Sequence, residues 1–260
     1  MLATRLLVEK GALQKAESER GRPEQLLSLN LNGPFALGAY LHKEHLRVGR
    51  VNLAGELLAS REAPVANPEK AHALVAQIVE EVRAVLPAGP DARALCLGLG
   101  FSLPGLLDPV QGRVVLAAAF PGLEKGLPLA ERMSEALAIP QVRMANAANS
   151  HLIAERLYGA LAGVRDAVLI ILEPGQIGAA ILTDGRVLRG TLESSAELGH
   201  VKIESEGPPC ACGGRGCLEA FVSWKYLRAR LIDKGRGDLA EAGAEGGLHE
   251  LWTSPRTACA

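Results

Sequence analysis

Three of the five cysteines in this chain lie close to one of its six histidines in a short, glycine-rich segment. The segment runs from Glu197 to Phe221 and reads ELGHVKIESEGPPCACGGRGCLEAF. One imidazole and three thiols are the ligand set of a closed tetrahedral zinc site. Glycines allow the tight turns that ligands so close in sequence need to converge on one ion. The predicted ligands are His200, Cys210, Cys212 and Cys217.

A zinc ion would supply much of the ordering energy of this segment, because the segment has few apolar side chains with which to build a core. Four protein ligands leave the ion no open position, so we expect a structural ion and not one that activates water. Unpaired surface thiols and a redox pair are the alternatives, although Cys-x-Cys is shorter than the usual Cys-x-x-Cys redox sequence. Closely spaced ligands that include a histidine disfavour an iron–sulfur cluster. Cys96 lies in an apolar run and is interpreted as a small buried side chain.

The composition is that of a globular protein with one large or two modest domains. The chain has 260 residues, of which 48% are hydrophobic, enough for a sizeable core. Its net charge of −1 gives no global attraction to nucleic acid, so any such binding needs a local patch. Charges or glycines interrupt the apolar runs before they reach membrane-spanning length, and no cleavable leader is evident. We therefore expect a cytoplasmic protein with no membrane partner, in which clustered cysteines bind metal.

The order of apolar patterns along the chain predicts an α/β fold. Two successive strands with turns near Lys43 and Gly55 open it, and a similar β-meander opens again at Asp166. This repetition predicts two related α/β lobes that face each other across a cleft. Between the two meanders we expect a helix at 69–86, a buried strand within 92–105, a helix at 127–138, a strand at 141–145 and a helix at 147–162.

The run Glu-Leu-Gly-His, nine residues, Cys-x-Cys-Gly-x-x-Gly-Cys-Leu-Glu resembles the signature of the ROK family, which contains bacterial sugar kinases and sugar-responsive transcriptional repressors. The resemblance extends from the N-terminus to about Trp224. It includes the stretches GRPEQLLSLN, GLGFSLPGLLDPVQGRVV, NAANSHLIAERLYG and IGAAILTDGRVLRGTLESSAELGH. It implies an actin-like ATPase fold, in which two RNase-H-like lobes hold a sugar in their cleft.

The resemblance also implies a division of the chain into three parts. Residues 1–33 would be a partial winged helix-turn-helix with a linker, 34–148 the first α/β lobe, and 149–260 the second lobe with the zinc segment. We expect the second lobe to be incomplete, because family members continue past the zinc segment with further helices and strands. DNA is an expected partner only if a complete helix-turn-helix is present. The family further implies a homodimer or higher homo-oligomer.

The N-terminal part of this resemblance can be stated more closely. Residues 1–13 resemble the end of a recognition helix and the turn after it. Residues 14–30 resemble the wing and the exit strand, and they include the Gly-Arg-Pro junction that precedes the sugar-binding body in family repressors.

Four residues match family positions that contact sugar hydroxyls: Asn146, Glu197, His200 and Glu219. Carboxylates and amides suit this task because they can bond several hydroxyls at once, and zinc would hold His200 and Glu219 in place. Outside such a signature, Glu197 and Glu219 would be interpreted as solvated or helix-capping acids.

The phosphate-transfer elements of the family are not matched. Family kinases carry an Asn-Asp pair whose Asp takes the proton of the attacking hydroxyl, whereas this chain has Asn146-Ala147. The first phosphate loop aligns with Tyr40–Glu44, which lacks its glycines, and the second aligns with Pro174–Gly178, which lacks its threonine. We therefore expect no catalytic residues.

The resulting hypothesis is a non-catalytic, repressor-like transcriptional regulator that binds a small-molecule sugar effector beside a structural zinc ion. One alternative is an ATP-dependent sugar kinase with unusual catalytic residues. The other is a degenerate or truncated sugar-binding module without DNA binding.

Overall fold

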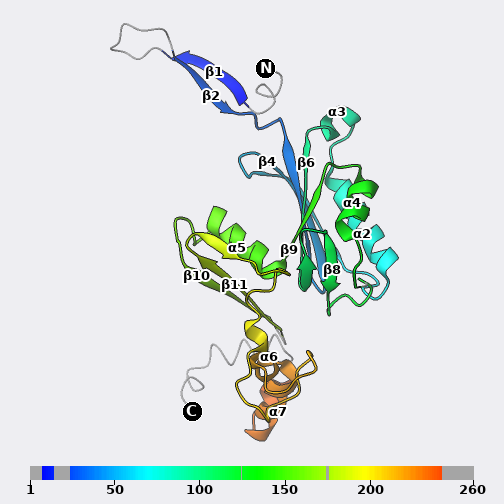
Figure 1. Ribbon diagram of the computed structural model, residues 1–260, viewed down its shortest axis with the longest axis vertical. Helices are drawn as coiled ribbons and strands as arrows, with labels where there is room; N and C mark the ends of the chain where they lie inside the picture. The colour runs from blue at the N-terminus through cyan, green and yellow to red at the C-terminus, as the bar shows by residue number, and fades with distance from the viewer. Residues whose placement is uncertain (1–7, 15–23, 124, 174–175, 242–260) are drawn as a thin grey trace. The chain divides into compact units, whose positions relative to one another are not determined.

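The backbone of the protein, given by a computed structural model, divides into two units (Figure 1). The structure describes residues 8–14, 24–123, 125–173 and 176–241. The first unit comprises residues up to Ser150 together with Thr191–Glu193, and the second unit comprises the remainder. The three-part division expected from the sequence stays a prediction.

A five-stranded sheet with the order β5-β4-β3-β6-β9 forms the centre of the first unit. Its first three strands form the predicted antiparallel meander, and β6 and β9 run parallel to β3 on the other side. Since β3, β6 and β9 are parallel, their carboxyl ends meet at one edge of the sheet. The strands are β3 (Phe35–Leu41), β4 (His45–Asn52), β5 (Leu57–Pro64), β6 (Cys96–Leu103) and β9 (Val142–Asn146).

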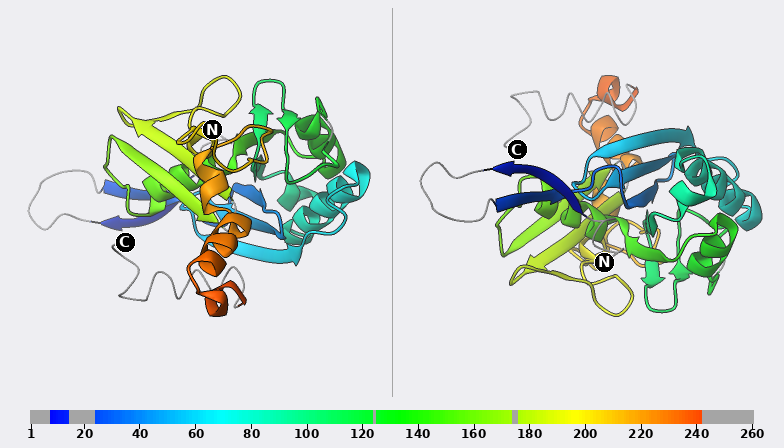
Figure 2. Two further views of the ribbon diagram at one scale, coloured as in Figure 1. Left: turned by 90° about the horizontal axis from the view of Figure 1, so that it is seen from below. Right: turned by 90° about the horizontal axis from the view of Figure 1, so that it is seen from above.

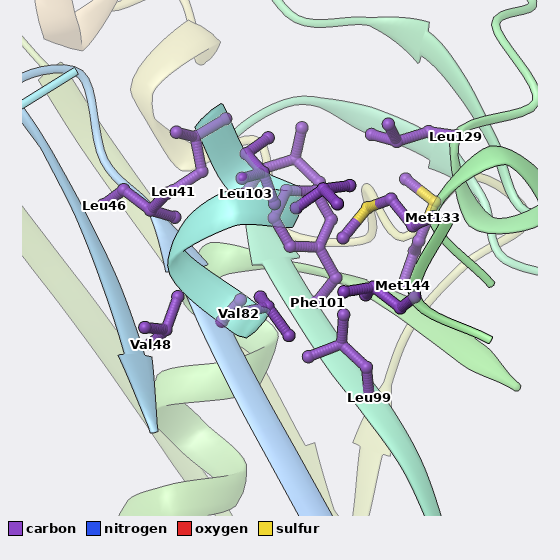
Figure 3. Close-up of a cluster of buried hydrophobic side chains, with 14 of the residues drawn as sticks. Leu41, Leu46, Val48, Val82, Leu99, Phe101, Leu103, Leu129, Met133 and Met144 are labelled. Atoms are coloured by element: carbon purple, nitrogen blue, oxygen red, sulfur yellow. The ribbon is translucent and has the colours of Figure 1, made fainter. Parts of the chain in front are cut away.

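Two predicted helices, α2 (Ala71–Val85) and α4 (Leu129–Leu137), pack with this sheet to form the hydrophobic core. Figure 3 shows Phe101 of β6 among aliphatic side chains and methionines contributed by the strands and by both helices. The apolar residues of α2 recur every three or four positions, so a single stripe of the helix is buried. Cys96 is also buried in this core, as expected.

Short elements that the sequence patterns did not indicate complete the first unit. They are the one-turn helix α3 (Pro90–Arg93) and a hairpin of β7 (Leu106–Asp108) and β8 (Arg113–Leu116). The carboxylate of Asp108 accepts hydrogen bonds from the backbone N–H groups of Val110 and Gln111 at 3.0 and 2.9 Å. The side chain of Asp108 thereby closes the hairpin turn.

The second unit is built on the second predicted meander, an antiparallel sheet with the order β10-β11-β12. Its strands are β10 (Ala167–Glu173), β11 (Gln176–Thr183) and β12 (Arg186–Leu188). Helix α5 (Ala147–Tyr158) begins in the first unit and continues into the second. The segment after β12 contains the 3₁₀ turn η1 (Leu198–His200) and the helices α6 (Leu218–Val222), α7 (Trp224–Asp233) and α8 (Gly237–Glu241).

The structure corrects the expectation for the N-terminal residues. Residues 8–13, expected to lie at the end of a helix, belong to β1 (Val8–Gln14), which pairs with β2 (Glu24–Leu29). Gly11 disfavours a helix at this position, and pairing with β2 satisfies the backbone groups of the strand. Residues 1–7 and 15–23, which include most of the expected wing, lie outside the described residues.

No helix in the described parts of the chain combines the length and the apolar character needed to cross a membrane.

The core of the first unit gives a direct test of stability. Phe101 is 1% exposed, so Phe101→Ala is expected to lower the free energy of unfolding by about 3–5 kcal/mol through lost burial and a residual cavity. Leu97→Ala on the same strand is the matched control, because Leu97 is 45% exposed and should lose much less. Urea unfolding followed by circular dichroism measures both. Equal losses for the two variants would contradict the assignment of the core.

Candidate functional site

The four predicted metal ligands converge in the second unit, where their ligand atoms all lie within 4.8 Å of one another. Cys210 Sγ is 3.7 Å from His200 Nδ1, and Cys212 Sγ is 3.7 Å from Cys217 Sγ. In a tetrahedral site with zinc–sulfur bonds of about 2.3 Å, two sulfur atoms are about 3.8 Å apart. The distance between Cys212 and Cys217 therefore matches one edge of such a site. A set of three thiols and one imidazole in this arrangement fits a zinc ion.

Backbone contacts hold the loop that carries these ligands. The N–H of Cys210 donates to the carbonyl of Gly214 at 2.9 Å, and Cys217 forms an isolated β-bridge with Lys202. Gly216 has a φ of 68°, and a Cβ atom added to it would lie 1.4 Å from the carbonyl oxygen of Glu204. The backbone passes close to Glu204 immediately before the last cysteine, and only glycine can therefore occupy this position.

The thiols of the cluster differ in their proton affinity. Burial, together with hydrogen bonds from the neighbouring thiols of Cys212 and Cys210, raises the pKa of Cys217 to about 11. A hydrogen bond with the backbone of Gly214 is the largest of the contacts that lower the pKa of the exposed Cys212. Metal ligation requires thiolates, so binding of a cation to this cluster would displace protons.

His200 joins the metal cluster to a carboxylate through its two ring nitrogens. Nδ1 faces Cys210, whereas Nε2 lies 3.9 Å from Oε2 of Glu197. Glu197 immediately precedes η1, so this turn brings the two side chains together across three positions of sequence. A metal ion on Nδ1 would fix the tautomer and leave Nε2–H as a hydrogen-bond donor on the side of Glu197.

Glu219 connects the segment after the last cysteine to the sheet of the second unit. Its Oε2 accepts the backbone N–H of Ile177 in β11 at 3.0 Å. Gly199 lies beside this contact: an added Cβ atom would be 2.9 Å from the carbonyl oxygen of Ile177 and 3.2 Å from Oε2 of Glu219. The structure thus gathers Glu197, His200 and Glu219 around Gly199, and it provides carboxylate oxygens and an imidazole in one place.

Asn146, the fourth residue expected to bind sugar, belongs to the first unit. Its Nδ2 donates to the carbonyl of Gly105 at 3.0 Å, and its Oδ1 accepts the N–H of Ala148 at 2.8 Å. The second contact caps the start of α5. The side chain of Asn146 therefore stabilises the junction between β9 and α5. Its contact with sugar stays a prediction.

The sequence analysis missed a buried polar network beside Asn146. Glu193 is 2% exposed, and its Oε2 accepts a hydrogen bond from Nδ2 of Asn149 at 3.0 Å. The carbonyl of Glu193 accepts from the same nitrogen at 3.2 Å. Its φ of 58° is unusual for a residue other than glycine, and the hydrogen bonds offset the associated strain. No feature of a single glutamate in LESSAE indicates burial, because the partner lies more than forty positions away.

The regions that align with phosphate loops have other structures. In the turn between β3 and β4, the rings of His42 and His45 are 4.4 Å apart, and Tyr40 lies 6.2 Å from each. Burial, followed by the nearby His42 and Arg47, lowers the pKa of His45. Ring side chains thus occupy a turn where a phosphate loop would present glycine amides.

The region that aligns with the second phosphate loop and the position of the family's catalytic aspartate also differ from those of a kinase. Pro174 and Gly175 lie outside the described residues, while Gln176 and Gly178 are already paired in β11. Ala147, at the position where family kinases carry the general-base aspartate, is buried as the first residue of α5.

Comparison with protein families matches residues 41–243 to a model described as the ROK family. The xylose repressor of Caldicellulosiruptor bescii is 28% identical over 236 residues, which cover 89% of this chain and 57% of the repressor. A glucokinase of Thermotoga maritima is 32% identical over 201 residues, which cover 76% of this chain and 60% of the kinase. The chain therefore spans little more than half the length of these relatives.

Comparison with solved structures gives the same picture of the fold. The crystal structure of a ROK family transcriptional regulator, a homologue of the E. coli MLC protein, has a TM-score of 0.72 and 30% sequence identity. The match covers 90% of this chain and 57% of the other. The two-unit architecture is accordingly the actin-like ATPase fold that ROK repressors and sugar kinases share.

The metal cluster predicts a specific effect of losing one thiol. Cys217→Ser is expected to reduce bound zinc from about one ion per chain to near zero, because serine is a poor ligand for zinc. The melting temperature should fall with it, because a bound ion would order the segment. Cys96→Ser is the control, because Cys96 is buried in the core away from the cluster and should leave the zinc content unchanged. Elemental analysis measures the zinc content, and full retention of zinc by Cys217→Ser would refute the ligand assignment.

The buried network predicts a loss of stability at Glu193. Glu193→Ala leaves the amide of Asn149 buried without its carboxylate acceptor, at a cost of about 1–3 kcal/mol in the free energy of unfolding. Glu193→Gln keeps an acceptor oxygen and the same backbone strain, so it should cost less. Urea unfolding compares the two variants, and an alanine variant as stable as the unmodified protein would show that the network does not stabilise the unit.

Proposed function

Since this chain belongs to the ROK family, we propose that it is a non-catalytic regulator of the repressor type, whose second unit binds a sugar effector beside a structural zinc ion. The observation that carries the proposal is the placement of His200 in the cluster of three cysteines, with Nδ1 3.7 Å from Sγ of Cys210 and Nε2 3.9 Å from Oε2 of Glu197. One side of this imidazole suits a metal, and the other side suits a hydroxyl-bearing ligand.

The chemistry around Gly199 supports a polyhydroxylated ligand. The carboxylates of Glu197 and Glu219 accept hydrogen bonds from hydroxyls, and Nε2–H of His200 donates one. A bound zinc ion would supply a fixed positive charge and hold the imidazole in one orientation. The ion would thus position His200. The hydrogen bond from the backbone N–H of Ile177 in β11 positions Glu219.

The alanine at the family's general-base position supports a binding function without phosphate transfer. Ala147 carries a methyl group that cannot accept a proton from a sugar hydroxyl. The turn between β3 and β4 carries the rings of His42 and His45, whereas phosphate binding depends on close approach to backbone amides. The similarity to a glucokinase keeps an ATP-dependent sugar kinase as the second candidate. That candidate requires another residue to act as base.

DNA is proposed as the second partner, on the strength of relatives that are named repressors. The hairpin of β1 and β2 is consistent with a wing, which would contact DNA together with a helix-turn-helix. A regulator of this kind acts in the cytoplasm, and we place this protein there. A sugar-binding module without DNA binding is the outcome if no helix-turn-helix accompanies the chain.

Thermal unfolding in the presence of sugars tests the proposal. D-Xylose, D-glucose and N-acetyl-D-glucosamine, each at millimolar concentration, should include one that raises the melting temperature, whereas ATP alone should not. Glu197→Ala should abolish the shift because it removes an acceptor beside His200. Glu131→Ala in α4 of the first unit is the control and should retain the shift. Sugar-dependent hydrolysis of ATP by the unmodified protein would favour the kinase instead.

A further inference from the structure

Residues 190–195, which follow β12, form a short loop whose two ends lie together. A Cβ atom added to Gly190 would be 3.3 Å from the backbone nitrogen of Ser195. The hydroxyl of Ser195 donates a hydrogen bond to the carbonyl of Leu188, the last residue of β12. Both ends of the loop therefore belong to the second unit, whereas Thr191–Glu193 between them belongs to the first. We call Thr191–Glu193 the tip of the loop.

Hydrogen bonds from the backbone and from a side chain attach the tip to the first unit. The backbone N–H of Leu107 in β7 donates to the carbonyl of Leu192 at 3.1 Å. Oε2 of Glu193 accepts from Nδ2 of Asn149 at 3.0 Å and from the backbone N–H of Asn146 at 3.4 Å. The carbonyl of Glu193 accepts from the same side-chain nitrogen of Asn149 at 3.2 Å. Glu193 thus provides most of the contacts that hold the tip.

The helix that supplies Asn149 also carries the chain from one unit to the other. Helix α5 begins at Ala147 in the first unit and continues from His151 in the second, where it lies alongside the strands of the sheet (Figure 2). The amino terminus of a helix carries partial positive charge, which favours a carboxylate beside it. This charge and the N–H donors compensate for the burial of the carboxylate of Glu193.

The backbone of Glu193 adopts a conformation that glycine would adopt without strain. Its φ is 58°, in the left-handed region, and the residue is 2% exposed. Strained residues of this kind persist where the surrounding contacts determine their conformation, and they concentrate at functional sites. The chain carries a glutamate at this position, and its carboxylate makes the contacts that hold the tip. The combination of strain, burial and hydrogen bonds indicates a role for this side chain.

The tip lies directly before the residues proposed to bind sugar. Glu197 follows Glu193 by four positions in the sequence. Beyond Glu197, the turn η1 is held against β11, because a Cβ atom added to Gly199 would be only 2.9 Å from the carbonyl oxygen of Ile177. Glu197 therefore belongs to a short segment that is held at both ends, by Glu193 on one side and by Gly199 on the other.

We propose that Glu193 is a positioning residue for ligand binding. Its buried carboxylate fixes the backbone that leads to Glu197, so that the side chain of Glu197 is in place before a sugar binds. The inference rests on the proposed function, because it explains what orders the proposed sugar-binding segment. Preorganised groups bind a ligand more tightly, since less conformational freedom is lost on binding. Glu193 acts through Glu197 and, being buried, makes no contact with the ligand itself.

Calorimetric titration with the sugar that stabilises the protein tests this role. Glu193→Ala removes the acceptor of Asn149 and Asn146, so it should weaken sugar binding about tenfold. Glu193→Gln keeps an acceptor oxygen for both donors and should bind within about twofold of the unmodified protein. The titrations are made at a temperature at which circular dichroism shows every variant to be folded.

Asn52→Ala is the matched control for a general loss of stability. Asn52 is also buried in the first unit, at 5% exposed, and its Oδ1 accepts the N–H groups of Ala54 and Glu56. Its replacement by alanine removes buried hydrogen bonds of the same kind, far along the chain from the tip, and should leave sugar affinity unchanged. Equal losses of affinity in Asn52→Ala and Glu193→Ala would overturn the proposal, because general destabilisation would then explain both.

Hydrogen exchange without ligand measures the order of the segment directly. The backbone amides of residues 194–198 should exchange faster in Glu193→Ala than in Glu193→Gln, while the zinc content of the two variants stays equal. Unchanged exchange, or sugar affinity in Glu193→Ala equal to that of the unmodified protein, would overturn the positioning role and leave the proposed function standing. An unmodified protein that binds none of D-xylose, D-glucose and N-acetyl-D-glucosamine would overturn the proposed function and this inference with it.

Discussion

The convergence of His200 with Cys210, Cys212 and Cys217 is the contact on which the organisation of the second unit depends. The loop around these residues has almost no apolar core, since its buried cluster contains only Cys210, Cys217 and Ala220. Backbone hydrogen bonds bend the loop, and a cation bound to its thiols and imidazole would supply the stability that an apolar core supplies elsewhere. The same loop leads into α6, and Glu219 of α6 returns to the sheet through the N–H of Ile177. The metal cluster and the sheet therefore fix the two ends of the segment that carries the candidate ligand-binding residues.

Recognition of a sugar and transfer of phosphate make different demands, and under the proposed function this chain meets only the first. Hydroxyl recognition needs fixed acceptors and donors, which Glu197, Glu219 and His200 can provide. Phosphate transfer needs a base in reach of the hydroxyl and backbone amides open to phosphate. Ala147 cannot act as the base, and rings fill the turn between β3 and β4. This division supports a regulator that retains the ligand chemistry of a sugar kinase without its reaction.

Much of the fold could be predicted from sequence, because its main strands and helices have strong periodic patterns. The helix expected at 69–86 is α2 (Ala71–Val85), and the second meander, expected to open at Asp166, begins with β10 at Ala167. The convergence of His200, Cys210, Cys212 and Cys217 could be predicted as well, because these residues are close in sequence. Features that depend on distant partners could not be predicted. The buried carboxylate of Glu193 depends on the amide of Asn149, which donates a hydrogen bond to it. The strand β1 depends on its pairing with β2. The hydrogen bonds of Asn146 to the N–H of Ala148 and to the carbonyl of Gly105 likewise depend on the folded backbone, which the sequence does not give.

The central claim is that a metal-held imidazole belongs to a sugar-binding site, and sugar affinity with and without the metal tests it most directly. The sugar among D-xylose, D-glucose and N-acetyl-D-glucosamine that stabilises the protein would be titrated calorimetrically into zinc-loaded protein, into chelated protein and into protein with zinc restored. We expect chelation to weaken binding at least tenfold and restored zinc to recover it, because His200 and Glu219 lose their fixed positions without the ion. Equal sugar affinity in all three samples would contradict the account.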